Sequence, residues 1–221
     1  ADESAMTAWL MQRWKRLVGT IGALASVLIL LTPIAIWHLT PTERIDLLVV
    51  NKSIPRPDFD KHAGLFWLLD YERLRSPDGR QFDEARDFVG YSPRADGPGT
   101  DVPIPAATAD LTYLSDAYGV YENDLAGTPG VVGSRRLAGG ISPAEAQTIL
   151  AGVRRGGTLV GEFNILSAPT DPAAADRLGR AFGVTASGWV GRHFEYLELT
   201  PDLPPWLPVL WQRQTGTRWQ F

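Results

Sequence analysis

The longest apolar segment of the chain lies near its amino terminus. Residues 17–39 (LVGTIGALASVLILLTPIAIWHL) contain no Asp, Glu, Lys or Arg. At about 1.5 Å per residue, a helix of this length spans the roughly 30 Å hydrocarbon core of a bilayer. A cleavable signal peptide is the competing interpretation, but its apolar region covers only about 7–15 residues and leads to a small-residue cleavage site. Ile36 is followed by Trp37, His38 and Leu39 and not by a small-residue cleavage site, so we predict an uncleaved transmembrane helix.

The charges around this segment predict its orientation. Arg13, Lys15 and Arg16 directly precede it, whereas the residues that follow carry almost no net charge. Loops rich in Lys and Arg stay in the cytoplasm. We therefore predict a cytoplasmic tail over residues 1–16, a transmembrane helix over 17–39 and an extracytoplasmic domain over 40–221.

Small residues form a stripe along this helix. Gly19, Gly22, Ala23 and Ser26 follow the spacing i, i+3, i+4, i+7, which brings them onto one face. Such faces allow close packing against a second transmembrane helix. Ordinary lipid-facing composition is the alternative interpretation.

Beyond residue 40, short apolar runs alternate with helical patterns. The runs predict strands over 45–51, 87–91, 111–115, 158–163 and 193–199. A helix is predicted over 60–74, with Leu65, Phe66, Leu68 and Leu69 on its buried face. Further helices are predicted over 142–155, where Ser142-Pro143-Ala144-Glu145 forms a capping box, and over 171–183. This order predicts an α/β fold with a doubly wound, mostly parallel sheet.

Composition excludes several functional classes. The formal net charge is −4, so the basic surface of a nucleic-acid-binding protein is missing. The chain contains no cysteine, which excludes disulfides, thiolate metal sites and cysteine nucleophiles. No serine lies in a G-x-S-x-G elbow, and the histidines are far apart in sequence. We therefore predict no bound metal and no cofactor.

Three stretches carry a resemblance to a known family. DLTYLSDAYGVYEND (110–124), GGTLVGEFNILSAPT (156–170) and GWVGRHFEYL (188–197) resemble a family of bacterial membrane-anchored proteins. The soluble domain of that family is similar to the class I glutamine amidotransferase-like (flavodoxin-like) fold. The resemblance covers about residues 45–221 and implies a bacterial inner membrane location and a chain that continues past the tryptophan-rich tail. Hydrolytic members of the superfamily use a cysteine that this chain lacks, so the resemblance implies a domain without glutaminase activity.

Polar residues at the predicted strand ends are the candidate site. In doubly wound sheets, ligands bind beyond the carboxyl ends of the strands. For a ligand-binding or catalytic function, Asp116, Glu122 and Glu162 are the candidate acid and base residues. Capping of helices and binding of loop backbone are the structural alternative for these carboxylates. Candidate ligand-binding residues are Asn51, Lys52, Tyr118, Asn164, Trp189 and Arg192.

The carboxyl-terminal tail is rich in tryptophan. Trp206, Trp211 and Trp219 lie among prolines, which indicates either a loop that covers the sheet edge or an aromatic docking surface. The leading hypothesis is a non-catalytic accessory or scaffold subunit that binds integral membrane subunits of a bioenergetic, photosynthetic or cell-envelope complex. The alternatives are an envelope enzyme or carbohydrate-binding module with a carboxylate cleft, and a sensor of a periplasmic ligand.

Overall fold

The computed structural model describes residues 3–94, 97–106, 109–127, 134–187 and 206–217. The chain divides into two compact units, Ala1–Thr185 and Ala186–Phe221. The first unit contains a long amino-terminal helix and an α/β domain. The second unit contains one described helix.

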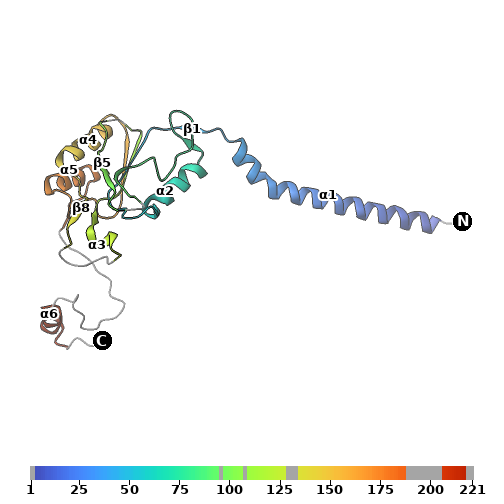
Figure 1. Cartoon of the computed structure of the whole chain (residues 1–221). Helices are drawn as coiled ribbons and strands as arrows, with labels where there is room; N and C mark the ends of the chain where they lie inside the picture. The colour runs from blue at the N-terminus through green and yellow to red at the C-terminus, as the bar shows by residue number, and fades with distance from the viewer. Residues whose placement is uncertain (1–2, 95–96, 107–108, 128–133, 188–205, 218–221) are drawn as a thin grey trace. The chain divides into compact units, whose positions relative to one another are not determined.

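The long helix, α1 (Glu3–Leu39), confirms the prediction of a single long apolar helix near the amino terminus (Figure 1). Its portion Trp9–Leu39 is long and apolar enough to cross a membrane, and no residue of the most apolar stretch is buried. The whole of α1, with its 37 residues, measures about 55 Å, well beyond the roughly 30 Å hydrocarbon core. Most of the predicted tail over residues 1–16 is therefore helical and continues α1.

A five-stranded sheet forms the centre of the α/β domain. Its strands are β2 (Leu47–Asn51), β4 (Val89–Ser92), β5 (Thr100–Val102), β6 (Leu111–Asp116) and β9 (Thr158–Gly161), in the order β5-β4-β2-β6-β9. Strands β4, β2, β6 and β9 run parallel, and β5 is antiparallel to β4. The predicted α/β class and mostly parallel sheet are confirmed. The antiparallel β5 lies in a Gly- and Pro-rich segment and was not predicted.

Helices pack on both faces of this sheet, because alternate residues of a strand point to opposite faces. Leu48, Val50 and Leu114 contact α4 (Pro143–Arg154) and α5 (Pro172–Phe182) on one face. Val49 and Tyr113 contact α2 (Asp60–Tyr71) on the other. Figure 1 shows α4 and α5 next to each other and α2 apart from them.

Two pairs of short strands and one short helix complete the first unit. β1 (Glu43–Arg44) pairs with β3 (Leu74–Arg75), and β7 (Val120–Tyr121) pairs with β8 (Arg136–Ala138). One turn of helix, α3 (Glu122–Leu125), follows β7. None of these elements has an apolar run long enough to stand out in the sequence.

Several predicted boundaries were wrong by a few residues. The helix predicted over 60–74 ends at Tyr71, because Arg73 has a φ of 57° and the chain then enters β3. Leu68 was predicted to be buried, but its side chain is 46% exposed. The strand predicted over 158–163 ends at Gly161, because Phe163 has a φ of 47°, which no strand residue adopts. The strand predicted over 193–199 lies outside the described residues.

The second unit contains the helix α6 (Trp206–Thr215), so the loop interpretation of this part of the tail was wrong. Pro208 falls in the first turn of α6, where the missing N–H has no intrahelical acceptor to satisfy. Trp206 and Trp211 are 61% and 44% exposed. Trp219 lies outside the described residues.

Candidate functional site

Polar residues gather where β2 and β6 end side by side. The chain leaves β2 towards β4 on one side, and it leaves β6 towards β9 on the other. In open parallel sheets, such a reversal leaves a crevice at the carboxyl ends of the strands. The register shifts here, since Val50 lies opposite Leu114 but Asn51 lies opposite Asp116. This bulge leaves Ser115 without a partner residue on β2, so the local geometry differs from a regular ladder.

Lys52, the first residue after β2, forms an ion pair with α4. Its Nζ lies 2.6 Å from Oε1 of Glu145, and the two side chains are only 5% and 21% exposed. The other carboxylate oxygen of Glu145 accepts the backbone N–H of Ser142, as the capping box predicts. Burial raises the pKa of Glu145, but the hydrogen bonds from Lys52 and Ser142 outweigh it, and the net pKa is lowered. The ion pair between Lys52 and Glu145 therefore attaches α4 to the end of β2.

Asp116, the last residue of β6, forms a second ion pair. Its Oδ2 lies 2.7 Å from Nζ of Lys61 on α2, and its Oδ1 accepts the backbone N–H of Tyr118 at 2.8 Å. The carboxylate is almost fully buried, whereas Lys61 is partly exposed. Asp116 therefore connects the end of β6 to α2 and to the loop that follows β6.

A neutral hydrogen-bond network lies between these ion pairs. Nδ2 of Asn51 donates to Nδ1 of His62 at 3.1 Å, and Nε2 of His62 donates to the carbonyl of Glu84 at 2.8 Å. Oδ1 of Asn51 accepts the N–H of Ser53, and the hydroxyl of Ser115 donates to the carbonyl of Lys61. Burial lowers the pKa of His62, which agrees with a neutral ring that donates from Nε2 alone.

Six of the residues in these contacts form what we call the strand-end cluster: Asn51, Lys52, Lys61, His62, Asp116 and Glu145. Among the described residues, the buried side-chain nitrogen or oxygen that lacks a hydrogen-bond partner is Nε of Arg73, which lies outside this cluster. A site prepared for a ligand usually leaves convergent polar groups free to bind it. The strand-end cluster instead satisfies its own polar groups.

The other two candidate carboxylates have different partners. Glu122 pairs with Arg135, and its Oε1 lies 2.6 Å from Nη2 of that residue. Glu162 accepts a hydrogen bond from the hydroxyl of Tyr113, whose pKa is raised mainly by burial and also by this contact. The described residues contain no group of three His, Asp or Glu side chains that could hold a metal ion. Asp116, Glu122 and Glu162 thus each serve a separate contact.

Exposed aromatic rings lie near the same ends of the strands. Tyr118, which follows β6, is 46% exposed, and Phe163, which follows β9, is 70% exposed. Phe163 was not singled out from the sequence, because its exposure depends on the left-handed backbone that ends β9. Asn164 is exposed beside it. Trp189 and Arg192 lie outside the described residues.

The small-residue stripe of α1 is open. A Cβ atom added at Gly19 or Gly22 would have no neighbour within 4 Å. The hydroxyl of Ser26 donates to the carbonyl of Gly22 and so is satisfied within the helix. Gly19, Gly22, Ala23 and Ser26 are all exposed.

Comparison with protein-family models, with curated proteins and with solved structures found no match to this chain.

Proposed function

We propose that this protein is a non-catalytic accessory subunit of a larger bacterial membrane complex. In this proposal α1 crosses the inner membrane with its amino terminus in the cytoplasm. The α/β domain is a doubly wound, class I glutamine amidotransferase-like domain that acts as a docking platform on the extracytoplasmic side. The partners are integral membrane subunits.

The observation that carries this proposal is the closure of the strand-end cluster. Lys52 and Asp116 occupy the position where related sheets bind ligands, yet each is paired at 2.6–2.7 Å with a helix of the same domain. A catalytic acid or base needs a proton-accessible group near the substrate. Here the charged groups fasten α2 and α4 to the sheet, which suits a rigid scaffold.

The open face of α1 supports a partner inside the membrane. In lipid, helices associate through close packing of small residues, because apolar surface alone gives no preference for another helix. Gly22 lies at the middle of the small-residue stripe and has no neighbour within 4 Å of an added Cβ. A second helix could therefore approach closely along this face.

Purification from native membranes tests the proposal. The tagged chain, expressed at its natural level, is extracted in mild detergent, and co-purifying proteins are quantified by mass spectrometry. We expect a fixed set of integral membrane proteins in stoichiometric amount. Gly22→Leu should reduce that set strongly, while Leu24→Ile, on the far side of the helix, should leave it unchanged. A lone monomer would contradict the proposal.

A ligand-binding module is the second candidate, because exposed aromatic rings stand near the strand ends. Aromatic faces such as those of Tyr118 and Phe163 stack on sugar rings, and Glu162 and Asn164 are exposed nearby. Soluble envelope oligosaccharides can be titrated against the protein by calorimetry. Saturable binding that is lost in Phe163→Ala would favour this function over the scaffold.

A further inference from the structure

The helix α2 carries apolar residues on both of its faces. His62, Phe66 and Leu69 are buried against the sheet, as expected of a helix in an α/β domain. The outer face bears Gly64, Trp67, Leu68 and Tyr71, which follow the spacing i, i+3, i+4, i+7. We call these four residues the outer stripe.

The outer stripe is exposed and preorganised. Trp67, Leu68 and Tyr71 are 67%, 46% and 54% exposed. The rings of Trp67 and Tyr71 stack with centroids 5.3 Å apart and an interplanar angle of 14°. Single exposed apolar residues are common on soluble proteins, but contiguous apolar patches mark surfaces that contact something other than water.

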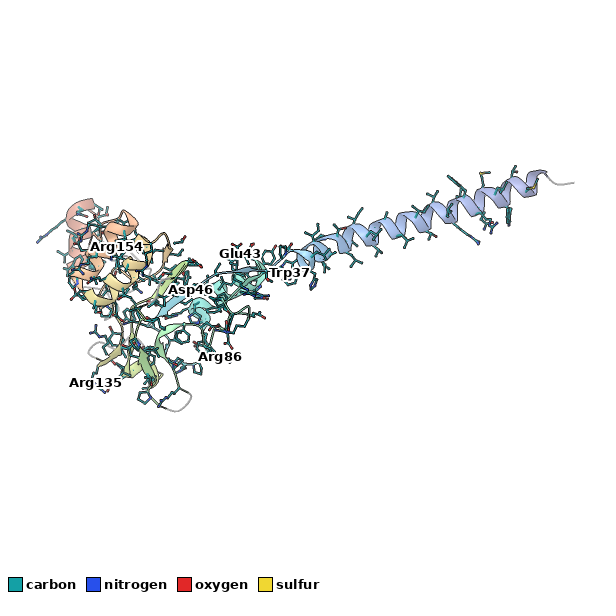
Figure 2. The ribbon with its side chains drawn as sticks, turned by 90° about the horizontal axis from the view of Figure 1, so that it is seen from above. Trp37, Glu43, Asp46, Arg86, Arg135 and Arg154 are labelled. Atoms are coloured by element: carbon teal, nitrogen blue, oxygen red, sulfur yellow. The ribbon has the colours of Figure 1, made fainter. Side chains whose placement is uncertain are left out.

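Direct contacts join the outer stripe to the end of the apolar helix α1. Nε1 of Trp37 donates to the backbone carbonyl of Tyr71 at 2.7 Å. The guanidinium of Arg73 lies over the ring of Trp37, 4.9 Å from its centroid. The backbone carbonyl of Arg73 also accepts the backbone N–H of Glu43 at 3.3 Å. Figure 2 shows Trp37 and Glu43 close to each other where α1 meets the α/β domain.

The connection between α1 and the sheet is short. Leu39 ends α1 and Leu47 begins β2, so seven residues separate the two elements. A fully extended chain of that length reaches about 25 Å at most. Within this connection β1 pairs with β3, which follows α2, and Trp37 bonds to Tyr71, so the carboxyl end of α2 stays next to the point where α1 would leave the hydrocarbon core.

We propose that the outer stripe lies in the headgroup region of the bilayer that α1 crosses, so that α2 rests on the membrane surface. This inference depends on the proposed anchoring by α1. Trp and Tyr favour this region, because their rings are apolar and their N–H and O–H groups are polar. The contact is continuous with Trp37, which already lies at the end of the apolar segment.

The charges around the outer stripe indicate the type of lipid contact. Asp60, Lys61 and Asp70 on α2 and Glu72 and Arg73 directly after it flank the outer stripe, so both signs are present. Such a surface has no strong attraction to anionic lipids, in contrast to a polybasic segment. The outer stripe should therefore bind zwitterionic bilayers as well as anionic ones and be insensitive to salt.

Depth-dependent quenching in lipid nanodiscs tests this inference. The chain contains no cysteine, so a single Leu68→Cys substitution gives one site for an environment-sensitive fluorophore. The full-length protein is placed in zwitterionic nanodiscs that contain lipids with a shallow or a deep quencher. We expect a blue-shifted emission and quenching by the shallow lipid that is several-fold greater than for Gln147→Cys, on the exposed face of α4. Gly64→Cys, where an added Cβ meets nothing within 4 Å, should repeat the result.

An internal control separates this inference from the anchoring itself. Ile29→Cys, in the middle of the apolar segment, should be quenched by the deep lipid. Quenching at position 29 with a water-exposed label at both positions 64 and 68 would overturn the inference and leave the anchoring intact. Loss of quenching at position 29 would refute the anchoring. Labels at 64 and 68 that are shielded in native membranes but not in nanodiscs would assign the outer stripe to a protein partner, which also overturns the inference.

Discussion

The helices α2 and α4 pack on opposite faces of one sheet, yet their outer surfaces differ. Both bury a face against the core, with Phe66 on α2 and Ile149 on α4 as examples. The outer face of α4 carries Gln147 and Arg154, as a helix in contact with water should. The outer face of α2 carries Trp67 and Tyr71 instead. The α4 side of the domain is thus polar, as expected in water, whereas the α2 side is apolar, as expected of a surface in contact with lipid or protein.

This difference indicates that folding alone does not explain the sequence of α2. The strand-end cluster attaches both helices through ion pairs, Lys52 with Glu145 on α4 and Lys61 with Asp116 on β6. The inner faces and these ion pairs hold both helices against the sheet. The outer stripe of α2 adds apolar surface that the isolated domain leaves exposed to water.

The largest expected effect is the difference in unfolding free energy between alanine variants of two adjacent residues of α2. Phe66→Ala should lower the free energy of unfolding by about 3–5 kcal/mol, because it removes a buried ring and leaves a cavity. Trp67→Ala should change it by no more than about 0.5 kcal/mol, because the ring is exposed. Urea unfolding followed by circular dichroism measures both. A large loss for Trp67→Ala would mean that the outer stripe is part of the core.

A slightly smaller loss is expected on the α4 side. Glu145→Ala leaves Lys52 buried without a partner, and removing one member of a buried ion pair costs about 3–5 kcal/mol. Because Glu145 is 21% exposed, water will reduce the loss towards the lower end of that range. Gln147→Ala is the control on the same helix and should be close to neutral. Equal stability of the two variants would contradict the structural role of the strand-end cluster.

The pH dependence of stability tests the histidine at the α2 side of the cluster. Burial lowers the pKa of His62 below 6.5 in the folded state, so between the two pKa values the unfolded chain binds more protons. Stability should therefore fall as the pH drops below 6.5 and stop falling below the folded pKa. Each unit of separation between the folded and unfolded pKa corresponds to about 1.4 kcal/mol.

Thermal unfolding between pH 7.5 and 4 measures this dependence, with His62→Gln as the comparison. The variant should lack the loss that begins near pH 6.5. Glu145, whose pKa is lowered from 4.5, should contribute a separate loss only in more acidic solution. A flat profile for the natural chain between pH 7 and 5 would contradict a neutral, buried His62.

The smallest expected effect concerns the start of α4. Ser142→Ala removes the side-chain cap that accepts the N–H of Glu145 and should cost about 1 kcal/mol. The matched variant Ser142→Asp keeps an acceptor and should retain most of the stability. Guanidinium unfolding curves compare the two. A loss for Ser142→Asp as large as that for Ser142→Ala would show that the cap is not what matters there.

Local signals in the sequence predicted the elements that depend on local chemistry. The capping box at Ser142 and the apolar run of β2 were predicted at or near their observed positions. The long apolar helix was predicted to end at Leu39, as it does, but it begins at Glu3 and not at residue 17. The exposure of Leu68 was not, because a helical pattern with apolar residues on both faces does not reveal which one the sheet covers.

Contacts between distant residues could not be predicted. Lys52 and Glu145 are 93 positions apart, and Asn51 meets Ser115 across a β-bulge. Such pairs are set by the register of the sheet, which a single residue of shift would change. The candidate residues Asn51, Lys52 and Asp116 were therefore identified correctly as strand-end residues, while their partners became visible only in the folded chain.

Labelling of single cysteines from one side of the membrane tests the central claim most directly. The chain has no cysteine of its own, so Met6→Cys and Gln147→Cys each provide one reactive position, before and after the apolar segment. In spheroplasts, a membrane-impermeant maleimide should label Gln147→Cys at once and Met6→Cys only after the membrane is opened. Labelling of both positions before opening, or of Met6→Cys alone, would contradict a single-pass anchor with the α/β domain outside the cytoplasm.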